Sequence, residues 1–492
     1  MMNIDRRRFL KGAGAAGMAG AASMAGMGAV PRHVSAANLA PAESYNNSNL
    51  ARFAGNVVVK PGKYSGLVQV VDLGTSETLA WLPMMLTGID APIPHHICAM
   101  PSKNPRQTFD FFFTMQRPGS PYINENSPEW RERGHMGMWK ARYDGRGEQN
   151  RIILVNDIAD TTGMGLGVHA ALGVGPNQGL VSFADGQKDL VLVTTTDDQP
   201  KIVVSYKFDY DPVAKTLNCS RVFPDPATGK FDYQGLRGMK ITHEALMGEE
   251  LMPADPTACF IDTLVWHPEL PLATILIRRL GLVVIVDTET WEPITVIATP
   301  KGAPDHFPLV RQTGYTWAFS VPSVLSPMHE AGFLTNGKYL FCCNNVLQNN
   351  VGVVDSSHHD PRRWKKIAYI EGFGRTHLPF HTGNMQDSRY IFFTAWARRP
   401  NRGYIVRCTP GNWTLDAKID IGPDPHTVDV LHDDEHISAV YSGHQGGQSG
   451  LVIINADSLE IVARMPSPNG HHDHVVIPAD WQMAKASRSI SV

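Results

Sequence analysis

Histidine is the residue whose number and spacing in this sequence suggest chemistry. The chain has 492 residues and 20 histidines. We expect six of these and one aspartate to lie in loops that enter the first strand of each repeat, about ten residues ahead of it or directly before it: His96, His169, Asp262, His329, His381, His426 and His472. A single loop histidine is usually an ordinary polar residue. Six imidazoles at equivalent positions instead indicate a transition-metal site, with copper the favoured ion.

Two of these assignments leave alternatives open. His95 adjoins His96, and His471 and His474 flank His472. The spacing alone does not decide which member of each group would be the ligand.

The strands that must position these residues follow a repeat of about 45–50 residues in the C-terminal half. Glycine-led apolar runs mark the repeat, each with a further apolar run shortly downstream: Gly281–Asp287, Gly352–Asp355, Gly403–Arg407 and Gly450–Asn455. Repeats of this length are typical of the four-stranded blades of a β-propeller. Strongly periodic amphipathic helices are hard to find, so we predict an all-β chain.

The two ends of the chain complete the pattern. The runs 66–72 and 78–83 have the form of outer blade strands with no partner strand ahead of them, and 475–478 has the form of an inner strand alone. Pairing between the ends would complete one blade and protect its sheet edge. We therefore predict a seven-bladed β-propeller closed by N- and C-terminal strands that pair in one blade.

Charge and cysteine content exclude several classes of function. The 44 Lys and Arg residues against 47 Asp and Glu residues give a formal net charge of -3, which provides no basic face for nucleic acid. The six cysteines are too sparse for a disulfide scaffold. They form no C-x-x-C motif, so a c-type haem, a zinc ribbon and an iron–sulfur cluster are not expected.

The first residues indicate export. Arg6–Lys11 has the twin-arginine pattern, an uncharged Gly/Ala/Met stretch follows over 12–30, and Val34–Ala36 offers a small-residue cleavage site. A membrane anchor is the alternative, but glycine and alanine are only weakly apolar, and no later apolar run is long enough to cross a bilayer. We predict a signal peptide over 1–37 and a single periplasmic propeller domain over 38–492.

The spacing of the histidines and the aspartate in the third position resembles the thiocyanate dehydrogenase family, periplasmic copper propellers related to nitrous oxide reductase. The resemblance covers nearly all of 38–492. It implies about three copper ions held by the seven predicted ligands. It also implies oxidation of thiocyanate with water to cyanate and elemental sulfur, with electrons passed to an external acceptor of the cytochrome c type. The oligomeric state stays open, with a homodimer among the arrangements considered.

The resemblance also suggests residues for the chemistry beside the metal. Lys63, at a spacing from His95 and His96 like that of the family's lysine, would bind the small anion, with Lys103, Arg106 and Arg375 as weaker candidates. A general base is expected near the metal, and Glu244 or Glu249 would suit this role.

Other functions remain open at this stage. A nitrous oxide reductase fits less well, because the chain has no room for a C-terminal copper domain after its last histidines. A copper propeller that oxidises another small sulfur compound, such as methanethiol, would not need Lys63. A binding module or copper store with structural histidines is the non-enzymatic alternative.

Overall fold

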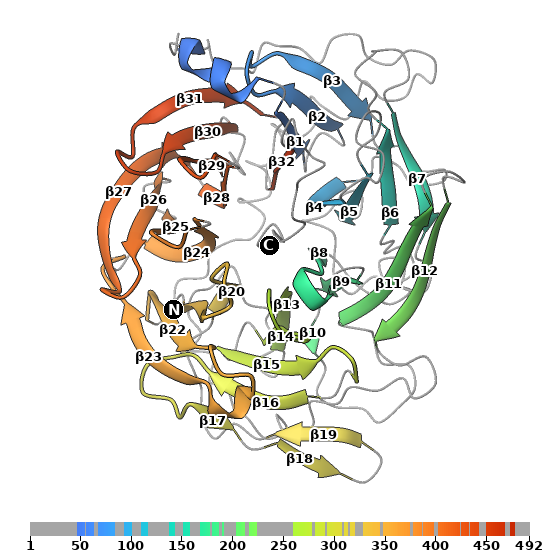
Figure 1. Cartoon of the computed structure of the whole chain (residues 1–492), viewed down its shortest axis with the longest axis vertical. Coiled ribbons are helices and arrows are strands. Elements are labelled where there is room, and N and C mark those ends of the chain that lie inside the picture. The colour runs from blue at the N-terminus through green and yellow to red at the C-terminus, as the bar shows by residue number, and fades with distance from the viewer. Residues whose placement is uncertain are drawn as a thin grey trace, which may run out of the picture. The chain divides into compact units, whose positions relative to one another are not determined.

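The structure is a computed structural model of the chain, and Figure 1 shows its strands. The chain divides into two units, Met1–Glu43 and Ser44–Val492, and all of the described residues belong to the second unit. The predicted signal peptide lies outside them. The structure describes residues 47–54, 56–62, 67–83, 93–100, 110–116, 137–142, 151–157, 168–177, 180–185, 189–190, 203–211, 216–223, 259–277, 281–290, 293–307, 309–312, 315–319, 328–344, 348–373, 377–385, 387–397, 402–423, 425–431, 433–441, 449–467 and 473–477.

The described residues form antiparallel sheets and contain no α-helix. The short 3-10 helices among them are η2 (Asn47–Phe53), η4 (Gly175–Asn177) and η8 (Pro361–Arg363). This confirms the all-β prediction for the part of the chain that the structure describes.

Seven sheets with four or more strands are present among these residues, together with one hairpin of two strands. The first sheet has the order β3-β2-β1-β32, with the strands β1 (Val57–Gly62), β2 (Leu67–Asp72), β3 (Thr78–Pro83) and β32 (Val475–Ile477). The second contains β4 (Ile93–Met100), β5 (Asp110–Gln116), β6 (Gly137–Arg142) and β7 (Arg151–Asp157). The third contains β8 (Val168–Leu172), β9 (Leu180–Asp185), β11 (Val203–Asp211) and β12 (Thr216–Phe223).

The fourth sheet has six strands, in the order β10-β13-β14-β15-β16-β17. They are β10 (Asp189–Leu190), β13 (Cys259–Trp266), β14 (Leu272–Ile277), β15 (Leu282–Asp287), β16 (Pro293–Ala298) and β17 (His306–Phe307). The hairpin that follows consists of β18 (Leu309–Gln312) and β19 (Tyr315–Phe319).

The last three sheets keep the order of the sequence. The fifth contains β20 (Met328–Phe333), β21 (Tyr339–Asn344), β22 (Asn350–Asp355) and β23 (Lys365–Ile370). The sixth contains β24 (His377–Asn384), β25 (Ile391–Ala397), β26 (Arg402–Thr409) and β27 (Thr414–Gly422). The seventh contains β28 (Pro425–Val430), β29 (His436–Tyr441), β30 (Gly450–Asn455) and β31 (Ile461–Pro466).

The two ends of the second unit pair in one sheet, as predicted. Val57 faces Ile477 and Val59 faces Val475 across β1 and β32, which lie side by side in Figure 1. One part of the prediction was wrong, because β2 does have a strand ahead of it. We overlooked β1 because Lys60 and Pro61 interrupt its apolar run, although every residue of this strand is buried.

Burial falls from the inner to the outer strands of a sheet. Every residue of β15 and of β30 except the last is buried, while the outer strand β27 alternates between exposed and half-buried positions over its first six residues and buries only Ile421. A strand buried on both faces needs a continuous apolar sequence, whereas an edge strand tolerates polar residues. The continuous apolar runs of the sequence therefore form the middle strands of the sheets, and these sheets stack on one another.

The apolar cores lie between neighbouring sheets. Phe341 and Val353 of the fifth sheet pack in one cluster with Phe393 of the sixth. The seventh sheet packs in the same way against the sheet of the terminal strands, where Val440 and Val476 share a cluster. Face-to-face packing of this kind requires shape complementarity along each interface.

Two glycines of the predicted repeat allow close contacts, Gly403 with the next sheet and Gly450 with its ladder partner in the same sheet. A Cβ atom on Gly403 would overlap the ring of Pro425 at the start of β28, and one on Gly450 would overlap the Tyr441 hydroxyl. The repeat therefore begins with glycine because a larger residue would push the neighbouring segment away.

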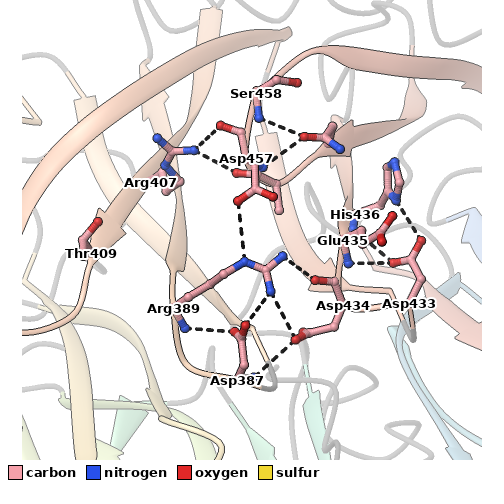
Figure 2. A network of polar contacts seen from close by, with 12 residues as sticks. Asp387, Arg389, Arg407, Thr409, Asp433, Asp434, Glu435, His436, Asp457 and Ser458 are labelled. Carbon is pink, nitrogen blue, oxygen red and sulfur yellow. Dashed lines mark hydrogen bonds and ion pairs between the residues drawn. The ribbon is translucent and has the colours of Figure 1, made fainter.

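Two arginines connect the sixth sheet to turns of the seventh (Figure 2). Arg407 Nη1 donates to the carbonyl oxygen of Ala456 at 2.9 Å, and its Nε lies 2.7 Å from Asp416 Oδ1. Arg389 Nη1 lies 2.6 Å from Asp387 Oδ2 and 3.4 Å from Asp434 Oδ2. The two guanidinium groups thereby pair with carbonyl and carboxylate oxygens where the two sheets meet, and these oxygens are not left without a donor.

Replacing Arg407 with methionine is expected to lower the free energy of unfolding by about 2–4 kcal/mol, because backbone acceptors of the neighbouring sheet lose a charged donor. The Arg407 side chain is 14% exposed, so water replaces it incompletely. Urea unfolding measures the change. Arg362→Met is the matched control, since that side chain is 65% exposed and pairs within its own turn, and its effect should stay below about 0.5 kcal/mol. Equal effects of the two substitutions would contradict the assignment.

Candidate metal centre

The predicted ligands lie on strands rather than in loops. His96 lies in β4, His169 in β8, Asp262 in β13, His329 in β20, His381 in β24 and His426 in β28. Each of these strands comes first along the chain in its sheet, except that the short strand β10 precedes β13. The prediction that these residues precede the first strand of each repeat was therefore wrong. The strands that we predicted to be the first of each repeat are the second. For five of these residues the structure describes the backbone, and for His426 it also describes the side chain.

A β-bulge contains five of these residues, three of them as its first residue and two, His96 and His381, as its second. In β28, Pro425 pairs with Tyr441 and Val428 pairs with Ala439, so two residues of β28 stand opposite one residue of β29. The same two-against-one irregularity occurs in four other strands that carry predicted ligands, where the pairs of residues that fall in it are 95–96 in β4, 262–263 in β13, 329–330 in β20 and 380–381 in β24. It also occurs in the hairpin strand β19, at residues 316–317, where no ligand is predicted. Five of the seven predicted ligands therefore share one backbone feature.

The bulges explain why sequence analysis missed these strands. An extra residue breaks the ladder of hydrogen bonds and shifts the alternation of side chains between the two faces of the sheet. Bulges of this kind redirect a side chain and are common next to active sites. His169 is the exception among the predicted ligands on strands, because β8 pairs with β9 without a shift there.

The strands that carry the predicted ligands contact one another in sequence. β4 contacts β8, β8 contacts β13, β13 contacts β20, β20 contacts β24, and β24 contacts β28. β32 contacts β4 as well. The predicted ligands are thus distributed over strands that neighbour each other, which a shared metal site requires.

The remaining predicted residues lie outside the described part of the chain. They are Lys63, Glu244, Glu249 and His472, together with the weaker candidates Lys103, Arg106 and Arg375 and the alternative ligand His471. Their assignments stay predictions from sequence.

His474 is described, and its surroundings remove it from the candidate ligands. The side chain is completely buried. Its Nδ1 lies 3.1 Å from Thr427 Oγ1 and its Nε2 lies 2.7 Å from Ser438 Oγ. A hydroxyl can donate or accept, so a neutral imidazole satisfies both contacts and has no nitrogen left for a metal.

The charge state of His474 agrees with this arrangement. Burial lowers its pKa to about 4, the neighbouring Asp473 acts in the opposite direction, and Lys60 lowers the pKa further. The imidazole is therefore neutral near pH 7.

Lys60 is a buried charge that sequence analysis did not single out. Its side chain is completely buried in β1, and Nζ donates to the carbonyl oxygen of Pro466 at 2.8 Å. Burial lowers the pKa of the Lys60 amine to about 7. The signal was present in the sequence as a lysine within the run Val57–Pro61, which is otherwise apolar.

Glu330 is a second buried charge that we did not predict. It follows His329 within the bulge of β20 and is 1% exposed. Burial raises the pKa of Cys343 well above its usual value, and the charge of Glu330 raises it further. Cys342, Cys343 and Cys408 are buried free thiols.

A separate group of three residues, whose types commonly bind metals, stabilises a turn. Among the described side chains, Asp433, Glu435 and His436 bring three donor atoms within 4.8 Å of one another (Figure 2). The Asp433 carboxylate accepts from His436 Nδ1 at 2.7 Å and from the backbone N–H of Glu435 at 2.9 Å. These bonds account for the arrangement, as expected for a histidine outside the predicted ligand set.

No protein family and no curated protein matches the chain by sequence. By structure, the chain is similar to a proposed 6-phosphogluconolactonase from Bacteroides uniformis, with 11% identity, 86% of this chain and 100% of that chain covered, and a TM-score of 0.51. A similar protein from Bacteroides fragilis has 9% identity, covers 86% and 98% of the two chains, and has a TM-score of 0.50. These likenesses show the fold, which is of the β-propeller type.

The described residues contain no helix that is long and apolar enough to span a membrane.

Proposed function

We propose that this protein is a copper-dependent periplasmic oxidoreductase that converts thiocyanate and water to cyanate and elemental sulfur. The observation that supports this most strongly is the bulge that recurs in five strands with His96, Asp262, His329, His381 or His426 in it. Structural histidines such as His306 and His474 lie outside these bulges and use their ring nitrogens for hydrogen bonds.

We also propose that the seven larger sheets are the blades of one closed propeller. Each of the strands that carry predicted ligands contacts the next, and β32 completes the sheet of the terminal strands beside β28–β31. In such an arrangement the inner strands face a common axis. Equivalent positions on these strands would then converge.

The donor set fits copper. Six imidazoles and one carboxylate suit a nitrogen-preferring transition metal, and seven donors for about three ions would leave coordination positions open. His96, His169, Asp262, His329, His381, His426 and His472 would hold the ions. Bound copper would supply binding positions for substrate and water and would accept electrons.

The reaction balances with an external acceptor. The carbon–sulfur bond of thiocyanate breaks, and a carbon–oxygen bond to the oxygen of water forms. Sulfur is oxidised by two electrons, which pass to an acceptor of the cytochrome c type, while two protons leave to solvent. Lys63 would neutralise the anion, and Glu244 or Glu249 would take a proton from the attacking water.

The proposed location depends on the leader. The twin-arginine pattern at Arg6–Lys11 would direct export of the folded, copper-loaded chain to the periplasm.

Metal analysis and an activity assay test the proposal. Protein exported with its own leader should contain about three copper ions per chain and reduce cytochrome c when thiocyanate is added. Cyanate and sulfur should form in equal amounts. Fewer than two copper ions per chain would overturn the cluster, and copper-loaded protein that oxidises methanethiol but not thiocyanate would overturn the substrate.

A further inference from the structure

A buried polar link connects the end of the chain to the strand that carries His426. Its members are His474, directly before β32, Thr427 in β28 and Ser438 in β29. Their exposed fractions are 0% for His474, 1% for Thr427 and 0% for Ser438. The link lies in the same interface as the apolar contacts of Val476 with Val440.

The link holds the bulge of β28 directly. Thr427 is one of the two bulged residues, and the other is His426. A bulged residue lacks a partner in the ladder of its own strand pair, so the ladder alone defines its orientation poorly. The contact of 3.1 Å between Thr427 Oγ1 and His474 Nδ1 provides a constraint from another sheet.

The other side of the imidazole is held equally well. His474 Nε2 lies 2.7 Å from Ser438 Oγ, and the His474 backbone N–H donates to Asp473 Oδ1 at 2.8 Å. The ring is therefore fixed at both nitrogens and at its backbone. A side chain fixed in this way can transmit its own position to Thr427.

We infer that His474 is a positioning residue that orients His426 for metal binding through its contact with Thr427. The inference rests on the proposed function, because it assigns a purpose to the link at one of the predicted copper ligands. Residues that orient metal ligands without touching the metal typically change affinity by about 10–100-fold when they are replaced.

Titration of the full-length, metal-free protein with Cu(II) against a competing chelator tests the inference. Thr427→Val keeps the shape of the side chain and removes the hydroxyl, and it should weaken the affected copper site by about 10–100-fold and change its electron paramagnetic resonance spectrum. Thr427→Ser restores the hydroxyl and should restore both properties. His474→Leu should weaken the same site.

A matched control separates positioning from stability. Thr295→Val removes a hydroxyl that lies 2.9 Å from His306 Nδ1, a histidine outside the predicted ligand set. This variant should bind Cu(II) as the wild type does, even where urea unfolding shows a similar loss of stability. If Thr427→Val lowers stability while copper affinity and spectrum stay unchanged, the link is only structural and the inference is wrong.

The outcomes distinguish the inference from the proposed function. A wild type that binds no Cu(II) would overturn both. A wild type that binds copper, together with a Thr427→Val variant that binds it equally well, would overturn the inference and leave the proposed function standing.

Discussion

Replacing His426 or His381 with alanine is expected to remove at least one copper ion per chain and to reduce thiocyanate oxidation by more than about 100-fold, because an open ligand position costs more than the loss of a supporting hydrogen bond. The two residues lie at the bulges of β24 and β28, and these strands contact each other. Loss of either imidazole should therefore disturb the same part of the metal site. Copper analysis of the purified variants and the cytochrome c assay measure the effect.

His306→Ala is the control for this experiment. His306 is bonded at both ring nitrogens, with Nε2 2.6 Å from the carbonyl oxygen of Trp364, and it lies outside the bulged strands. Its replacement should cost stability and leave the copper content of the folded protein unchanged. Full copper content and activity in both His381→Ala and His426→Ala would contradict the assignment of the bulges to metal binding.

The second large effect concerns stability and comes from Lys60. In the folded protein its pKa is lowered from 10.5 to about 7 by burial. Between these two pH values the unfolded chain binds a proton that the folded chain does not bind, so the free energy of unfolding rises with pH. The full penalty is present below pH 7 and amounts to about 5 kcal/mol.

Lys60→Met should remove this pH dependence. Near pH 7 and below, the variant should be more stable than the wild type by about 2–4 kcal/mol, since the lost hydrogen bond to Pro466 offsets part of the gain. The difference should fall by about 5 kcal/mol as the pH rises past 10.5, so that the wild type becomes the more stable protein by about 1–3 kcal/mol, the value of its hydrogen bond to Pro466. Urea unfolding of both proteins at several pH values gives this difference directly.

Because the wild type and Lys60→Met differ only at this lysine, the pH dependence that comes from other titrating groups cancels when their free energies of unfolding are compared. The buried thiols of Cys342, Cys343 and Cys408 also have raised pKa values, but they contribute equally to both proteins. Lys301→Met serves as the control, because the Lys301 side chain is 60% exposed and pairs with Glu371 at the surface. A difference between Lys60→Met and the wild type that stays constant with pH would refute the assignment.

The sequence by itself determined the all-β class and the middle strands of the sheets, and it led to the prediction of a metal site. Runs such as 282–286 and 451–454 are continuously apolar, and only a strand covered on both faces needs such a run. Glycine at 403 and 450 marked the repeat in the sequence, and the structure shows the close contacts that a side chain there would disturb. The recurrence of histidine at one place in the repeat is also a property of the sequence, and it already selects nitrogen ligands.

The tertiary structure alone decided where these residues lie. Bulges depend on the register between two strands, and register depends on partners that are distant in sequence, so the strands β4, β13, β20, β24 and β28 could not be recognised from local alternation. The burial of Lys60 and His474 likewise depends on sheets built from other parts of the chain. Local sequence thus specifies which residues can pair and which can bind a metal, while non-local packing decides which polar groups are buried, in which protonation state, and beside which partners.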